Sequence, residues 1–532
     1  MSSLTGTVAL VRLALRQGRV RLAVWLYASV GLVVTTAVSF ARLYPTIAGR
    51  REFATGVADN PAFNALYGHL LAPTSIGAMT MWRIGVNGAA LTGLLSVLLV
   101  VRYTRAEEET GRLELLGSGV VGRRAPLTAA LLVALVANLV IGVLLAAGMI
   151  GLGTGVPGSA ALGLAFVTTG WLFGAVAAVT AQLTETARAA NGLAIGVLGF
   201  SVVLRGAGDS GGGLSWLSWL SPAAWPEELH SYAGERWWVL GLPLVGTAVL
   251  LASAYSLVAR RDLGAGLLPV RPGPAQAAPS LRSPLALAWR LQRGVLMGWT
   301  VALLLFGAIF GSLAAGIGDL LRSSSQLMDA INRLGGGQRA LVDAFIAAVM
   351  GILAAGAAAY ALQAALRLRT EETDLRAEPL LATAVTRTRW AWSHTVFAMF
   401  GSAVILAAGG LAAGVAHGLR THDATQVLRL LGAALVQLPA VWVVAGIAVA
   451  LFGMLPRQVV ACWGFLVGFL LLGQLGPVLQ LSQWVMDLSP FTHVPRVPGG
   501  AFTMTPLIGL AAAAAVLTAA GFAGFRRRDA GV

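Results

Sequence analysis

The sequence contains no lysine, because all 37 of its basic residues are arginine. A nucleotide-binding P-loop needs its lysine to reach the terminal phosphates. The chain therefore has no ordinary P-loop, and we expect no enzymatic activity in it.

Residues that carry chemistry are also scarce. Cys462 is the only cysteine, which excludes a disulfide or a thiolate metal site within one chain. The six histidines are scattered and show no metal-ligand spacing. We therefore expect no catalytic residues, no metal site and no cofactor.

Charge is scarce as well. Only 11% of the 532 residues are charged, 57% are hydrophobic, and the mean hydropathy is +0.78. A soluble chain of this length needs more charge to cover its surface, so most of this one must face lipid or other helices. The 66 glycines favour close packing of membrane helices over a β-barrel. The predicted fold class is therefore all-α, a polytopic membrane protein.

Apolar runs of roughly 20 residues predict twelve spans, six in each half, and so two pseudo-twofold six-helix halves. The first run is too long for a signal-peptide core and is interpreted as a retained span. The expected spans cover residues 22–41, 82–101, 127–150, 160–182, 190–207, 237–258, 294–315, 341–366, 393–415, 429–453, 458–475 and 505–525.

Three parts of the chain follow from this count. The first half, 1–265, begins with arginines among apolar residues, which predicts an N-terminal interfacial helix or, alternatively, a positive flank to the first span. A cytoplasmic linker covers 266–288, where Pro269–Ser283 is rich in Pro, Ala and Ser. The second half covers 289–532.

The arginines also predict the orientation. They are dense in the loops 102–126 and 259–293, whereas the short loop 151–159 has no charge. The positive-inside rule then places both termini in the cytoplasm and the protein in the plasma membrane. The net charge of +15 is explained by topology and anionic headgroups, so no nucleic-acid partner is expected.

A charged segment beside the membrane occurs twice, at 102–124 (the first island) and at 367–389 (the second island). Six charged positions match without a gap: Arg105 and Arg369, Glu107 and Glu371, Glu108 and Glu372, Arg112 and Arg376, Glu114 and Glu378, Arg123 and Arg387. An internal repeat of this kind indicates two homologous halves. Arg260-Arg261-Asp262 and Arg527-Arg528-Asp529 close the two halves, and Leu-Ser-Pro recurs at 220–222 and 488–490.

The spacing of Glu108 and Arg112 predicts an i,i+4 ion pair on a short amphipathic helix that ends at Gly117 and Gly119. Such a helix either only fixes the topology or docks a partner. The acidic residues favour docking, because the positive-inside rule does not require them. Two copies call for a symmetric pair of partners.

The islands, the closing Arg-Arg-Asp and the six plus six spans resemble the membrane subunit of a type-2 ABC exporter. The resemblance is to the actinobacterial polyketide-antibiotic and multidrug exporter permeases with fused halves, and it covers essentially the whole chain. In that family the loop between the second and third spans is a coupling helix that enters a groove on the ATPase. In the second island Pro379 stands in place of Leu115 and the glycines are lost, which leaves open whether both ATPases are engaged equally.

The resemblance implies an exporter of hydrophobic or amphipathic compounds that works with two copies of a separate ATPase. It also implies that ATP and Mg²⁺ are bound by that partner and not by this chain. The docking residues that it implies are Glu107, Glu108, Arg112, Glu114, Glu371, Glu372, Arg376 and Glu378. It also implies that spans 2, 5, 8 and 11 line the transport path, whose outer part would include Arg83, Asn87 and Arg205. The alternatives are snorkelling of the two arginines to the headgroups and a helix–helix hydrogen bond for Asn87.

Two other function classes compete. A proton-coupled secondary carrier of the major-facilitator type fits the span count, and Gly-Arg-Arg at 122–124 resembles part of that family's cytoplasmic loop. Such carriers use an acidic residue inside the membrane, and no predicted span carries one well inside it. A membrane scaffold or sensor would need a soluble domain, for which the sequence gives no indication.

Overall fold

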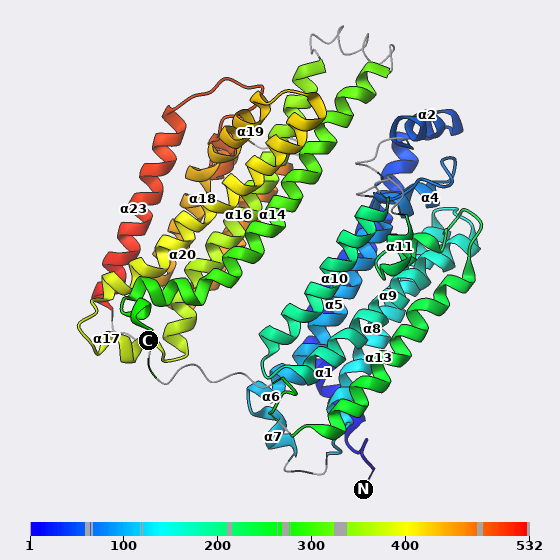
Figure 1. Ribbon diagram of the computed structural model, residues 1–532, viewed down its shortest axis with the longest axis horizontal. Helices are drawn as coiled ribbons and strands as arrows, with labels where there is room; N and C mark the ends of the chain where they lie inside the picture. Colours follow the sequence, from blue (N-terminus) through cyan, green and yellow to red (C-terminus); the bar gives the residue numbers. More distant parts are fainter. Residues whose placement is uncertain are drawn as a thin grey trace. The chain divides into compact units, whose positions relative to one another are not determined.

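The computed structural model describes residues 2–58, 64, 67–117, 119, 121–209, 215–262, 264–268, 276, 278–323, 338–475 and 482–528. Within these residues the secondary structure is helical and no strand is present. Twelve helices are long and apolar enough to cross a membrane, which confirms the all-α polytopic fold (Figure 1). Much of the expected linker Pro269–Ser283, and Asp529, lie outside the described residues.

The chain divides into two units, 1–272 and 273–532, and six of the twelve long helices belong to each. The long helices of the first unit are α1 (Thr7–Leu43), α5 (Val86–Val101), α8 (Ala125–Gly151), α9 (Val156–Leu183), α10 (Ala187–Asp209) and α13 (Gly241–Arg260). Its shorter elements are α2 (Ile47–Ala58), α4 (Ile76–Thr80), α6 (Glu107–Glu109), α7 (Arg112–Gly117), α11 (Trp216–Leu220), α12 (Trp225–Glu228) and η3 (Trp237–Leu240). Two π-helical turns, η1 (Met81–Gly85) and η2 (Arg102–Ala106), extend α5 at its two ends.

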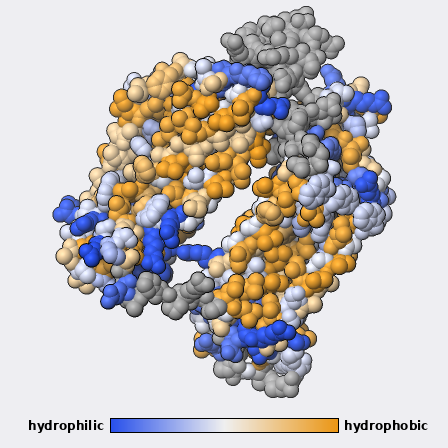
Figure 2. Space-filling model, in the orientation of Figure 1, coloured by the Kyte–Doolittle hydropathy of each residue, from blue (hydrophilic) through white to orange (hydrophobic). Residues whose placement is uncertain are grey.

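The second unit contains α14 (Pro284–Ser323), α16 (Gln338–Thr373), α18 (Arg387–Thr421), α19 (Thr425–Leu435), α20 (Leu438–Met454), α21 (Cys462–Leu475) and α23 (Thr505–Arg527). Its shorter elements are η4 (Pro279–Leu281), α17 (Ala377–Leu381), η5 (Pro456–Ala461), α22 (Gln483–Met486) and η6 (Pro490–His493). Figure 2 shows hydrophobic side chains along the flanks of each unit and hydrophilic ones gathered toward its ends, as expected for helices in lipid.

Glycines let neighbouring helices touch along their backbones. A Cβ atom added to Gly307 on α14 would collide with the carbonyl oxygen of Gly409 on α18. One added to Gly453 on α20 would collide with the carbonyl oxygen of Gly521 on α23. Membrane helices associate by such close packing, because lipid supplies no hydrophobic force between them.

The arginine-rich N-terminal segment continues directly into the first span. Residues 7–43 form one continuous helix. At about 1.5 Å per residue, this helix exceeds the ~30 Å hydrocarbon core by several turns. The helix continues through Gly18, whose missing side chain makes room for the Tyr103 hydroxyl. That hydroxyl donates to the Ala14 carbonyl at 3.0 Å.

The predicted amphipathic helix of the first island is also divided. The helix of the second span continues to Glu109, the chain turns at Thr110–Gly111, and α7 follows as a separate short helix. Gly111 has a φ of +72°, a left-handed conformation that ends a helix. Leu375, at the same position of the second island, has a φ of +57°. α6 and α7 lie at the same end of the first unit as the N-terminus (Figure 1).

Candidate functional site

Glu108 of the first island is the centre of a buried ion cluster. Its Oε2 atom lies 2.7 Å from Arg105 Nη1, and Arg261 grips both carboxylate oxygens, at 2.6 and 3.0 Å. The Glu108 side chain is 8% exposed and that of Arg105 is fully buried. Arg261 also donates from Nε to Gln182 Oε1 at 2.7 Å. Bidentate arginine–carboxylate pairs are among the strongest polar contacts in proteins, so this cluster fixes the island firmly.

Arg105 joins the cluster to two other parts of the unit. Its Nε and Nη2 atoms donate to the Ala181 carbonyl, at 2.9 and 2.6 Å, in the last turn of α9. A cation is favourable there, because the last carbonyls of a helix lack partners and carry partial negative charge. Nη2 also donates to the Ala265 carbonyl at 3.1 Å, just beyond α13. The island is thereby tied to the ends of α9 and α13.

The second unit contains the same cluster. Glu372 lies 3.1 Å from Arg369 Nη1, and Arg528 grips its two oxygens at 2.8 and 2.9 Å. The Glu372 side chain is 4% exposed. We call these residues the ion lattice: Arg105, Glu108, Arg123 and Arg261 in the first unit, Arg369, Glu372, Arg387 and Arg528 in the second. Arg123 and Arg387 complete it, since they donate to the carbonyls of Arg261 and Arg528.

The predicted pair of Glu108 and Arg112 is wrong. The turn at Gly111 interrupts the helix between them, and Arg112 lies 3.6 Å from Glu107 instead. Arg376 makes the matching contact with Glu371, at 3.3 Å. Glu108 is therefore held internally, in ion pairs with residues near it and far from it in sequence.

The islands nevertheless present exposed side chains. Arg112, Glu114 and Leu115 are exposed on α7, and the Leu115 side chain is 78% exposed. In the second island Arg376 and Glu378 are exposed, and Leu375 is 60% exposed. Of the predicted docking residues, Arg112, Glu114, Arg376 and Glu378 are thus exposed. Glu108, Glu371 and Glu372 are instead buried in ion pairs.

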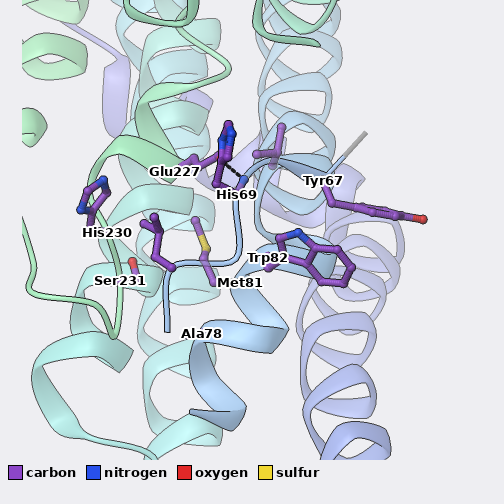
Figure 3. A pocket seen from close by; sticks show the side chains of 10 residues that line it. Tyr67, His69, Ala78, Met81, Trp82, Glu227, His230 and Ser231 are labelled. Atoms are coloured by element: carbon purple, nitrogen blue, oxygen red, sulfur yellow. Dashed lines mark hydrogen bonds between the residues drawn. The ribbon is translucent and has the colours of Figure 1, made fainter. Parts of the chain in front are cut away.

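A second buried charge cluster lies at the C-terminal end of α10. Arg205 is 2% exposed, and its Nε atom lies 2.8 Å from Asp209 Oδ2 and 3.3 Å from Glu227 Oε2. The snorkelling interpretation of Arg205 is therefore wrong. Glu227 Oε1 accepts a hydrogen bond from the His69 amide at 2.7 Å (Figure 3). Gly68 has a φ of +81°, and a Cβ atom there would overlap the Glu227 carboxylate.

Two acids share one arginine in this cluster. Burial raises the pKa of Glu227 to about 7, the Arg205 guanidinium opposes the rise, and the Asp209 carboxylate adds to it. Because two ionised acids beside one arginine leave a buried negative charge, Glu227 takes up a proton near neutral pH. Glu227 thus joins α10, α12 and the segment around Gly68. Its ion pair with Arg205 depends on the protonation state of Glu227.

Arg83 and Asn87 lie exposed on one face of the second span, four residues apart. The Arg83 guanidinium lies 4.3 Å from the centre of the Tyr67 ring, a cation–π contact. The cavity beside them has a volume of about 20 Å³ and is lined by Tyr67, Trp82 and Glu227, among others (Figure 3). It has room for about one water molecule and is too small for a drug.

The comparisons with known proteins agree with each other. The family model described as "Multidrug efflux system permease Rv1217c, C-terminal domain" matches residues 281–526. The multidrug efflux system permease protein Rv1217c of Mycobacterium tuberculosis is 45% identical over 530 residues, which cover 99% of this chain and 96% of that protein. The chain belongs to this family of multidrug efflux permeases. The family model falls on the second unit, whereas the similarity to the mycobacterial permease spans both.

Several site residues of this efflux permease were not predicted from its sequence. Arg261 and Arg528 stood in the repeated Arg-Arg-Asp, and their equal placement after both halves was the available signal. Asp209 was missed as the partner of Arg205, although the two residues are four apart on one helix, a spacing that predicts an ion pair. Glu227 gave only a weak signal, as an acid in a Trp- and Pro-rich loop.

The Leu-Ser-Pro repeats of the permease also acquire a role. Ser221 donates from Oγ to the Ser201 carbonyl at 2.6 Å, and Ser489 donates to the Phe469 carbonyl at 3.2 Å. Both serines are fully buried, and both bonds join the loop to the preceding long helix, α10 or α21. Among the described residues no cluster of three or more His, Cys, Asp or Glu could hold a metal ion.

Proposed function

We propose that this chain is the membrane subunit of an ATP-driven exporter of hydrophobic or amphipathic compounds, including drugs. The observation that carries the proposal is the ion lattice, which in each unit ties the exposed charged segment to helix ends of that same unit. The printed name of the 45% identical relative, a multidrug efflux permease, supports the transported class.

In this proposal a separate ABC ATPase binds ATP and Mg²⁺, and one copy docks on each island. The exposed side chains of α7 and of the second island contact the ATPase. The ion lattice then transmits its movement to the ends of the second, fourth and sixth spans of the first unit, because Arg105 and Arg261 bond to all three. Closure of the ATPase pair would switch the path from inward- to outward-facing. The islands and both termini then lie in the cytoplasm.

The first test is co-purification with the ATPase encoded beside this chain, followed by an assay of ATP hydrolysis in lipid. We expect a complex of one permease with two ATPases whose turnover responds to hydrophobic drugs. A chain that purifies alone and moves solute on a proton gradient would contradict the proposal and favour a secondary carrier.

Reversing the exposed charges tests the docking role directly. Glu114→Lys combined with Glu378→Lys should abolish the complex and drug-stimulated hydrolysis, because like charges placed across an interface cost several kcal/mol (~1–5). Both side chains are exposed, so the fold should tolerate the change. Glu52→Lys on α2, an exposed acid away from the islands, is the matched control and should leave both readouts unchanged. Normal stimulated turnover in the double variant would remove the docking role.

A further inference from the structure

A groove opens at the island end of the first unit, between α1, the α5–η2 helix and α10. Its volume is about 320 Å³, which is within the range of small-molecule sites. Leu22, Trp25 and Leu98 contribute to an apolar wall. Arg21 and Arg102 also line it, so one cavity offers an apolar surface together with two cations.

Two polar atoms of the groove lack hydrogen-bond partners among the described residues. Arg102 Nε and Asn191 Oδ1 are buried, and within the described chain neither makes a hydrogen bond. Neither Arg21 nor Arg102 is in an ion pair with any described residue. A buried donor or acceptor without a partner destabilises the protein, and a ligand with a complementary group would recover that free energy.

Arg102 differs from Arg105, which lies three residues further on in the same π-helical turn. Arg105 is fully buried and is held by Glu108 and the Ala181 carbonyl. Arg102 begins the π-helical turn η2, and such turns occur frequently at functional sites. The ion lattice has thus taken up Arg105 and left Arg102 available to the groove.

We propose that this groove binds transported compounds that join an apolar body to an acidic group. The carboxylate, phosphate or sulfonate of the compound lies against Arg21 and Arg102, and its body lies along Leu22, Trp25 and Leu98. Asn191 Oδ1 accepts a hydrogen bond from an N–H or O–H group of the compound. This inference rests on the proposed export function, since it names one substrate class for it.

The groove is also connected to the first island. Glu109 Oε2 accepts a hydrogen bond from the Ala187 amide at 3.0 Å, at the N-terminus of α10. Ala187 itself lines the groove. A displacement of the island would therefore move one wall of the groove, so the contact gives ATPase docking a direct route to the bound compound.

Two fluorescent probes with one skeleton test the proposal. Anilinonaphthalene sulfonate carries an acidic group, and N-phenylnaphthylamine is the same body without it. The full-length chain is reconstituted in phosphatidylcholine nanodiscs, and binding of each probe is titrated. Arg21→Gln and Arg102→Gln should each weaken sulfonate binding roughly tenfold or more, the value of one charge-assisted contact. Binding of the neutral probe should change less than about twofold, since its contacts remain.

Two further variants keep the test independent of folding. Arg19→Gln, an exposed arginine on the same helix that does not line the groove, should leave both probes unaffected. Leu98→Trp fills the groove and should weaken both probes. Two results would overturn the proposal. One is that the arginine variants bind the sulfonate as tightly as the wild type, and the other is that the arginine variants weaken both probes equally.

Lipid is the competing occupant. If phosphatidylglycerol added to the nanodiscs displaces the sulfonate from the wild type at low mole fraction, the groove is a lipid site and the proposal is overturned. The export function is tested separately with the ATPase present. Acid-selective binding without ATP-dependent transport would contradict the export function alone, whereas transport without acid-selective binding would contradict the groove alone.

Discussion

Leu375 occupies a backbone conformation that Gly111 occupies without strain. Both residues follow the second long helix of their unit. The backbone N–H of each donates to the backbone carbonyl of the ion-lattice glutamate three residues before it, from Gly111 to Glu108 at 2.9 Å and from Leu375 to Glu372 at 3.1 Å. A left-handed conformation costs a residue with a Cβ atom about 1–2 kcal/mol. The second island therefore keeps the turn of the first with a less suitable residue.

Leu375→Gly should stabilise the second unit. The relief of strain exceeds the entropy that glycine adds to the unfolded chain, and we expect a net gain of roughly 0.5–1 kcal/mol. The Leu375 side chain is 60% exposed, so little packing is lost. Thermal unfolding of the purified protein should show a higher midpoint, and Gly111→Ala should show a lower one. A lower midpoint for both variants would mean that the turn is not under strain at Leu375.

At the scale of elements, Glu227 joins α10, α12 and the segment around Gly68. The hydropathy of the sequence does not predict that these three segments lie together. The charged and titratable groups around it are Arg205 and Asp209 from α10, His69 from the segment after Gly68, and Glu228 and His230 from its own loop. The pKa of Glu227 is about 7 in the folded state, against an ordinary 4.5. The folded state thus holds this proton more tightly than the unfolded state does.

The pH dependence of stability follows from that difference. An acid whose pKa is raised on folding contributes stability below its unfolded pKa, and the contribution is lost as the pH rises from about 4.5 through 7. The melting temperature should therefore fall between pH 5 and 7.5. Burial also raises the pKa of Glu228, which adds to the fall, and it lowers the pKa of His230, which opposes it below about pH 6.5.

Glu227→Gln isolates the contribution of Glu227. It keeps an oxygen for the His69 amide, and it should flatten the fall in melting temperature with pH. Asp423→Asn is the control, because hydrogen bonds from Thr425 lower the pKa of Asp423, so that it titrates below this window. An unchanged slope in the Glu227 variant would exclude Glu227 as the titrating group.

The twelve long helices could be predicted from sequence because each is a local property, a sufficient length of apolar residues. Their ends extend past the predicted spans, since helices continue into the headgroup region where hydropathy gives no signal. The partners of Glu108 could not be predicted, because Arg261 lies far along the chain and only the fold brings it near. The i,i+4 expectation for Arg112 failed for a local reason: Gly111 was interpreted as part of a helix, although its freedom to adopt positive φ ends one.

At the scale of the whole molecule, each unit contains its own copy of the ion lattice, but the surroundings of the two copies differ. In the first unit Glu109 links the island to α10, whereas Thr373 occupies the matching position in the second. The Thr373 hydroxyl donates to the Arg369 carbonyl within its own helix, at 2.9 Å. Glu227 likewise has no acidic counterpart in the second unit, where Pro495 stands at the same distance from Leu-Ser-Pro.

This difference predicts unequal islands. Glu109→Ala should lower drug-stimulated ATP hydrolysis roughly tenfold. The ATPase should stay bound, because the docking surface remains while the bond to α10 is lost. One hydrogen bond to a charged acceptor contributes about 1.5–3 kcal/mol, enough for a roughly tenfold effect on coupling. The matched variant Thr373→Ala should leave stimulation unchanged, since its hydroxyl bonds only to its own helix.

The two variants together distinguish symmetric from asymmetric drive. If Glu109→Ala and Thr373→Ala both leave stimulation intact, the Glu109–Ala187 contact carries no coupling and the islands act through the ion lattice alone. If both reduce stimulation equally, the second island has a link to its own helices that replaces the missing acid. Loss in the first variant only would mean that each ATPase pushes on an equal lattice, while only the first unit passes the movement on to α10.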